Sequence, residues 1–167
     1  PRWLSEGISV YEERQANPTW GQAMSPNYRE MILGDALTPV SQLSGAFLAP
    51  PSPLHLNFAY YESSLVVEYL VDKYGMETLQ RILDDLGAGR PINESLQRYT
   101  GSIEALDVEF SAYARDLANQ LGPDADWEQP QLPANASQEQ LQQTLVESGL
   151  WTSLRTRPYS KAPALGS

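Results

Sequence analysis

The sequence predicts an all-α protein, an irregular bundle of about five to six helices. Apolar residues recur at spacings of three and four in several segments, which is the periodicity of amphipathic helices. Glycine or a capping Ser or Asn stands at the ends of these segments. No segment shows the convincing alternation of apolar and polar residues that is typical of strands. With 167 residues, the chain is long enough for one domain with a substantial core.

The first predicted helix runs from Trp3 to about Arg14. Glu6 falls at the edge of its apolar face, where most carboxylates are simply solvated. Gly7 lies inside this face, although glycine costs about 1 kcal/mol relative to alanine in a helix interior. We therefore expect another segment to approach the helix closely at Gly7. The apolar face consists of Trp3, Leu4, Gly7, Ile8, Val10 and Tyr11.

The strongest periodicity follows Asn57, a plausible N-cap, and Gly75 ends that helix. The segment before it is rich in proline and is predicted to be a loop through residue 57. A shorter helix is expected over 27–34, and residues 38–47 are expected to hold one turn. Three further helices are predicted, over 76–89, from Pro91 to about Tyr99, and from a Ser102 cap onward.

The composition changes after the last of these helices. We expect a helical domain over 1–121, a proline-rich linker over 122–136 and an extra helix over 137–149. That helix opens with a capping box of Ser137 and Gln140. Residues 150–167 are expected to form an extended or disordered tail.

Composition excludes several classes of function. The 21 acidic and 11 basic side chains give a net charge of −10, so nucleic acid is not an expected partner. No apolar run approaches the ~20 residues of a membrane span. The chain has no cysteine and one histidine, His55, which excludes thiol chemistry and a zinc site of three local ligands. His55 is expected to be a surface imidazole.

Two stretches carry a resemblance to a known family. "PRWLSEGISVYEE" resembles the third-ligand helix of the gluzincin zinc metallopeptidases, in particular of the bacterial peptidase MA-like proteins. "YYESSLVVEYLVDKYG" is similar to the next helix of that family, which carries a tyrosine that can face the zinc-bound oxyanion. The resemblance covers about 1–121.

The resemblance implies a role for two residues. Glu6 matches the glutamate that is the third zinc ligand in the family. Either Tyr60 or Tyr61 matches the family's tyrosine, and Tyr61 is preferred because Glu62-Ser63-Ser64 then falls in register. The periodicity alone favours a core position for Tyr61. The substrate implied for the intact parent is a peptide or protein, and its metal is Zn²⁺.

The chain departs from the family because it contains no His-Glu-x-x-His motif. We therefore expect it to be the carboxy-terminal part of a peptidase domain, inactive by itself and without bound zinc. A non-catalytic helical interaction module and a pseudo-peptidase are the alternatives. The sequence leaves open the oligomeric state and the compartment, export to the periplasm included.

Overall fold

The computed structural model describes residues 1–17 and 20–122, and these form helices without any strand. The all-α prediction is confirmed for this part of the chain. It contains α1 (Arg2–Ala16), α2 (Pro26–Leu33), the 3₁₀ helix η1 (Val40–Phe47), α3 (Pro53–Tyr74), α4 (Met76–Gly87), α5 (Ile92–Thr100) and α6 (Ile103–Gln120).

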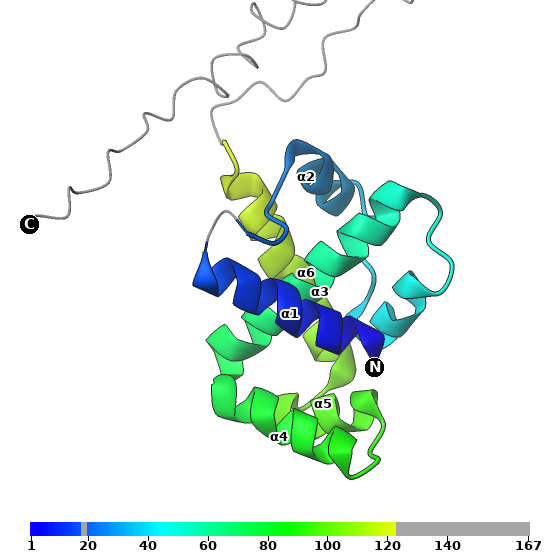
Figure 1. Ribbon diagram of the computed structural model, residues 1–167, viewed down its shortest axis with the longest axis vertical. Coiled ribbons are helices and arrows are strands. Elements are labelled where there is room, and N and C mark those ends of the chain that lie inside the picture. Colours follow the sequence, from blue (N-terminus) through cyan, green and yellow to red (C-terminus); the bar gives the residue numbers. More distant parts are fainter. Residues whose placement is uncertain (18–19, 123–167) are drawn as a thin grey trace, which may run out of the picture. The chain divides into compact units, whose positions relative to one another are not determined.

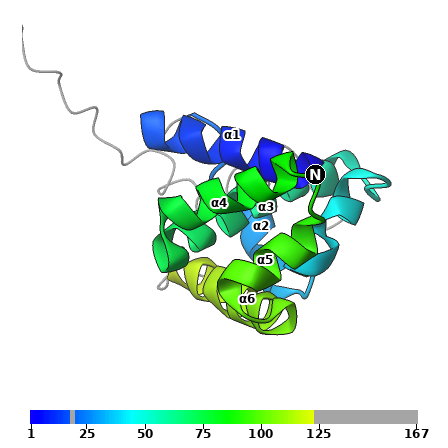
Figure 2. The same ribbon diagram turned by 90° about the horizontal axis from the view of Figure 1, so that it is seen from below.

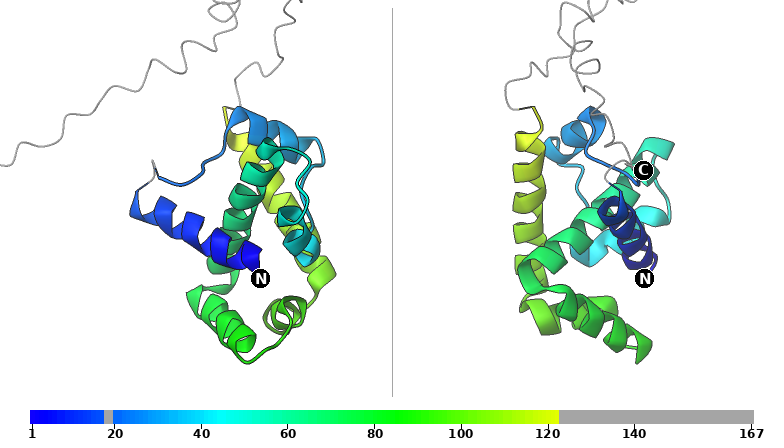
Figure 3. Two further views of the ribbon diagram at one scale, coloured as in Figure 1. Left: turned by 45° about the vertical axis from the view of Figure 1, so that its right-hand side comes forward. Right: turned by 60° about the vertical axis from the view of Figure 1, so that its left-hand side comes forward.

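The long helix α3 is the centre of the arrangement. α1 packs along one side of α3, and α6 lies on the other side (Figures 1 and 2). α2 packs on α6, whereas η1 contacts α1, α3 and α6. α4 and α5 lie next to each other at the end of the bundle where α3 stops (Figure 3). Helices therefore surround α3, which explains why its apolar positions extend around much of its circumference.

The core is a single cluster of buried side chains in this described region. Its largest fully buried members include Trp3 and Leu4 of α1, Leu65 and Leu70 of α3, and Phe110 of α6. The predicted apolar face of α1 is confirmed, since Trp3, Leu4, Gly7, Val10 and Tyr11 are buried. Burial of large side chains such as these stabilises a fold by roughly 1.5–3 kcal/mol each.

The start of α3 differs from the prediction. The helix begins at Pro53 rather than after Asn57, and Ser52 is its N-cap, with Oγ accepting a hydrogen bond from the His55 N–H at 3.4 Å. Proline is well tolerated in the first helical turn because its missing N–H has no partner there anyway. The proline-rich composition predicts a loop here, but Pro53 opens the helix. His55 is exposed in the first turn, as expected for a surface imidazole.

The segment from Val40 to Phe47 also holds more than the predicted single turn, because it forms the whole of η1. The other predicted caps are confirmed. Gly75 ends α3 with a positive φ of 85°, and the Ser102 side chain accepts a hydrogen bond from the Ala105 N–H at 3.3 Å. No helix in the described part of the chain is long and apolar enough to cross a membrane.

The expected linker, extra helix and tail fall on residues 123–167 apart from Gly122, and so lie outside the described residues.

Candidate functional site

Glu6 stands at the first turns of α1, on the boundary between the buried face and solvent. About a third of its side chain is exposed, at 35%. The Arg2 Nε donates to Glu6 Oε1 at 3.3 Å, and the Arg2 Nη2 donates to the Tyr60 hydroxyl oxygen at 2.8 Å. One guanidinium therefore connects the carboxylate of α1 with the tyrosine of α3. The Arg2 guanidinium also lies 5.4 Å from the centre of the Phe47 ring, within cation–π range.

Gly7 positions this cluster because it lets α1 approach α3 closely. A Cβ atom at Gly7 would lie 2.6 Å from the carbonyl oxygen of Ser63 and 2.8 Å from its carbonyl carbon. Real Cβ atoms do not approach backbone atoms so closely, so only glycine fits this crossing. The close approach expected from the sequence is confirmed, and its partner is the backbone of α3 one turn after Tyr60.

Tyr61 lies elsewhere. Its side chain is buried and stacks on Tyr28 of α2, with ring centres 4.9 Å apart and planes inclined by 16°. The structure thus joins Glu6 to Tyr60, the less favoured of the two alternatives, and places Tyr61 in the core position that periodicity favours. Sequence register could not separate the two, because adjacent helical residues differ by 100° in direction.

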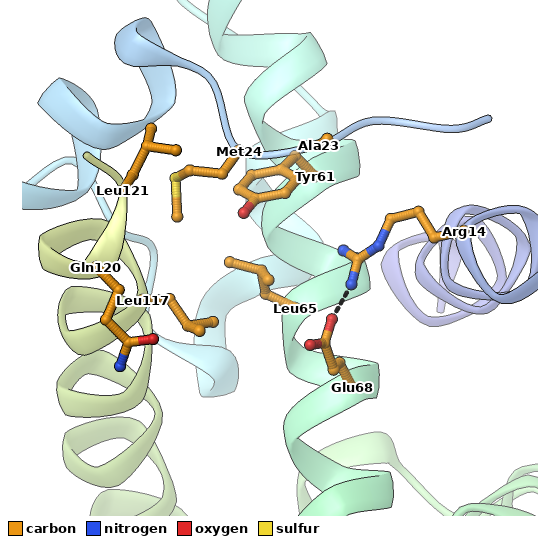
Figure 4. Close-up of a pocket in the computed structure, with 9 residues that line it drawn as sticks. All are labelled: Arg14, Ala23, Met24, Tyr61, Leu65, Glu68, Leu117, Gln120 and Leu121. Atoms are coloured by element: carbon orange, nitrogen blue, oxygen red, sulfur yellow. Dashed lines mark hydrogen bonds and ion pairs between the residues drawn. The ribbon is translucent and has the colours of Figure 1, made fainter. Parts of the chain in front are cut away.

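Tyr61 lines a cavity of about 310 Å³ between α3, α6 and the segment that leads into α2. Figure 4 shows its hydroxyl pointing into the space in front of α6, between Met24 and Leu65. Arg14 of α1 closes one side, where it pairs with Glu68 and donates to the Ser64 Oγ at 3.1 Å. Burial raises the pKa of Tyr61 to about 12, so its hydroxyl keeps its proton at neutral pH. This cavity is therefore largely apolar, with one neutral hydroxyl and an ion pair at its edge.

Glu62 is the feature that the sequence did not predict. Only 1% of this residue is exposed, and its Oε1 accepts the Thr38 N–H at 2.6 Å. Its Oε2 is buried without a hydrogen-bond partner. Burial raises the pKa of Glu62 to about 8, and the bond from Thr38 only partly offsets this. The available signal was a glutamate placed between Tyr61 and Leu65 within an apolar stretch of helix.

Comparison with known proteins assigns the helical part of the chain. The family model of the Peptidase MA superfamily matches residues 1–116. The chain belongs to the Peptidase MA superfamily. Within this superfamily assignment, the matched residues include the Glu6, Arg2 and Tyr60 cluster and all of α1 to α5. No solved structure matches the chain.

A different likeness lies at the other end. The model of the NqrA second alpha/beta domain matches residues 136–167. The NqrA component of the Na(+)-translocating NADH-quinone reductase from Cellvibrio japonicus (strain Ueda107) is 68% identical over 34 residues, which are 20% of this chain and 8% of that protein. The same component from Neisseria meningitidis serogroup A / serotype 4A is 39% identical over 71 residues, 42% of this chain and 12% of that protein. The chain thus spans about a tenth of the length of these curated relatives.

The described residues of this Peptidase MA superfamily member supply a metal with only one ligand from the Glu6 cluster. A catalytic zinc site takes three protein ligands and keeps one position open. The described ranges hold no group of three His, Cys, Asp or Glu side chains that could bind a metal ion. His55 cannot complete the set from its present place, since its Nδ1 lies 2.8 Å from the Ser52 Oγ at the start of α3. Glu6 fits such a site as one carboxylate ligand and needs partners from another segment.

Proposed function

We propose that this chain is the carboxy-terminal part of a zinc-dependent peptidase domain that hydrolyses peptide bonds in the intact protein. The single observation that carries the proposal is the Glu6, Arg2 and Tyr60 cluster within residues that match the Peptidase MA superfamily. Glu6 would be one metal ligand, and two more would come from a segment outside the described residues. By itself the chain is expected to be inactive and free of zinc.

The residues of the cluster have complementary tasks in this proposal. When bound, zinc polarises a scissile carbonyl and lowers the pKa of water. Arg2 engages Glu6 Oε1, which orients the carboxylate at the edge of α1. The Tyr60 oxygen accepts from Arg2, so its own O–H can donate to the oxygen of a substrate carbonyl. A preorganised donor of this kind contributes roughly 3–4 kcal/mol to catalysis.

The test is hydrolysis of casein by the complete protein that the natural gene encodes. We expect Glu6→Gln to abolish hydrolysis and Glu12→Gln, on the exposed side of the same helix, to preserve it. Equal activity of the two variants would contradict a ligand role for Glu6. A complete protein that does not hydrolyse peptides would favour the alternatives, a pseudo-peptidase or a helical interaction module.

A second candidate function is favoured by the likeness over residues 136–167 alone. We propose that this segment associates with a Na(+)-translocating NADH-quinone reductase, since the curated relatives are the NqrA component of that enzyme. Co-purification of the full chain with the reductase complex, compared with a chain that ends at Gly122, tests it. Association that is independent of residues 123–167 would contradict this second candidate.

A further inference from the structure

A second cavity, separate from the Glu6 cluster, lies against the first half of α3. It measures about 200 Å³ and lies between the α2–η1 connection, the end of η1, the proline-rich segment and α3. In Figure 1 these are the neighbouring blue, cyan and turquoise segments between α2 and the middle of α3. Glu62 and His55 are the titratable side chains that line it.

The polar wall of this cavity is rich in acceptors. Glu62 has one oxygen bound to the Thr38 N–H, while its buried Oε2 has no hydrogen-bond partner. Pro50 and Pro51 also line the cavity, and proline has a carbonyl acceptor but no N–H donor. The remaining lining includes the apolar side chains of Ala46, Ala49, Phe58 and Ala59. A ligand that satisfies Oε2 must therefore bring hydrogen-bond donors and an apolar body of a few carbon atoms.

We propose that this cavity binds a primary ammonium group on a short aliphatic chain, with the ammonium donating to Glu62 Oε2. An ammonium has three donors and no acceptor, which matches a wall of acceptors. Its positive charge compensates the buried carboxylate, whose isolated charge is otherwise costly at this depth. The net charge of −10 on the chain also favours the approach of a cation. The ammonium can come from a free small amine or from the lysine side chain of another protein.

Protonation gives the proposal a distinctive pH dependence. Because burial raises the pKa of Glu62 to about 8, the carboxyl must lose a proton before it pairs with an ammonium at neutral pH. Binding should therefore tighten about tenfold for each pH unit up to about 8 and then level off. His55 lines the same cavity and is exposed, so a protonated imidazole there acts in the same direction by repelling the cation.

The experiment is NMR titration of the full chain with n-propylammonium, N-acetyl-lysine-N-methylamide and the neutral control n-propanol. We expect shifts at Ala59 and Phe58 with both amines, binding at least tenfold weaker in Glu62→Gln, and no comparable binding of propanol. Binding of propylammonium alone identifies small free amines, whereas binding of the lysine derivative identifies a lysine side chain. Both results support an ammonium site.

The carboxyl itself provides a readout that does not depend on a variant. The ¹³C signal of the Glu62 side-chain carboxyl should titrate at lower pH in saturating propylammonium than in its absence. An unchanged midpoint would overturn the proposal, as would equal binding by Glu62→Gln or equal binding of propanol. The last result would assign the cavity to uncharged ligands.

Discussion

At the scale of single residues, Glu62 determines how the fold responds to pH. Its carboxyl is buried and its pKa is raised to about 8, compared with about 4.3 in an unfolded chain. The folded state therefore binds a proton more tightly than the unfolded state. The stability that this provides is complete below about pH 4.3 and is lost as the pH rises to about 8.

Glu62→Gln should remove this dependence. Glutamine keeps an oxygen for the Thr38 N–H and carries no charge, so the variant should gain stability over the natural protein as the pH rises from 5 to 8. The gain should be about 1.4 kcal/mol for each pH unit at most. Urea unfolding at several pH values measures it, with Glu12→Gln as the exposed control. A difference that is constant with pH would show that Glu62 does not titrate in this range.

The two adjacent tyrosines should differ in their effects on hydrolysis. In the complete protein, Tyr60→Phe should lower kcat by roughly 10²–10³-fold with little change in KM, because it removes a donor used in the transition state. Tyr61→Phe removes a hydroxyl that points into the apolar cavity of Figure 4 and should leave kcat within a few fold. Steady-state kinetics on a fluorogenic peptide compares them. A larger loss in Tyr61→Phe would restore the register preferred from the sequence.

At the scale of helices, the crossing of α1 over α3 depends on Gly7. Gly7→Ala should destabilise the fold by about 1–3 kcal/mol, because its Cβ would meet the backbone of Ser63 and force the helices apart. This loss opposes the gain of about 1 kcal/mol in helix propensity.

Gly87→Ala is the matched control for that effect. Gly87 is exposed at the end of α4, and a Cβ there would meet nothing within 4 Å. The control should be neutral or slightly stabilising in the same thermal unfolding measurement. A stabilising effect of Gly7→Ala would show that the two helices can separate without cost.

Helix ends show which part of the fold can be predicted from the sequence. The periodicity locates α1, α4, α5 and α6, because their apolar faces and glycine or serine caps are local features. The start of α3 is not predicted, because a proline such as Pro53 is typical both of a loop and of a first helical turn. The length of η1 is not predicted either, because a 3₁₀ helix has a different period from an α-helix.

The candidate site was predictable to a similar extent. Gly7 indicates a close contact, but only the packed helices identify Ser63 as its partner. Glu6 was found through the resemblance, whereas Tyr60 and Tyr61 could be separated only by the direction in which α3 faces α1. The burial of Glu62 depends on the α2–η1 connection, which is distant in sequence, so no local pattern predicted it.

At the scale of the whole molecule, two likenesses occupy different parts of the chain. Residues 1–116 match the Peptidase MA superfamily and include the described cluster around Glu6. Residues 136–167 match a domain of NqrA and lie outside the described residues. The peptidase proposal therefore depends on the helical region, and the quinone reductase candidate depends on the remainder.

The most direct test of the central claim is the zinc content of the complete natural protein, measured by elemental mass spectrometry after dialysis. We predict about one zinc per chain in the natural protein and in Glu12→Gln, and a large loss of zinc in Glu6→Gln. The 167-residue chain alone should hold none. Full zinc occupancy in Glu6→Gln, or no zinc in the complete protein, would contradict the assignment of Glu6 as a metal ligand.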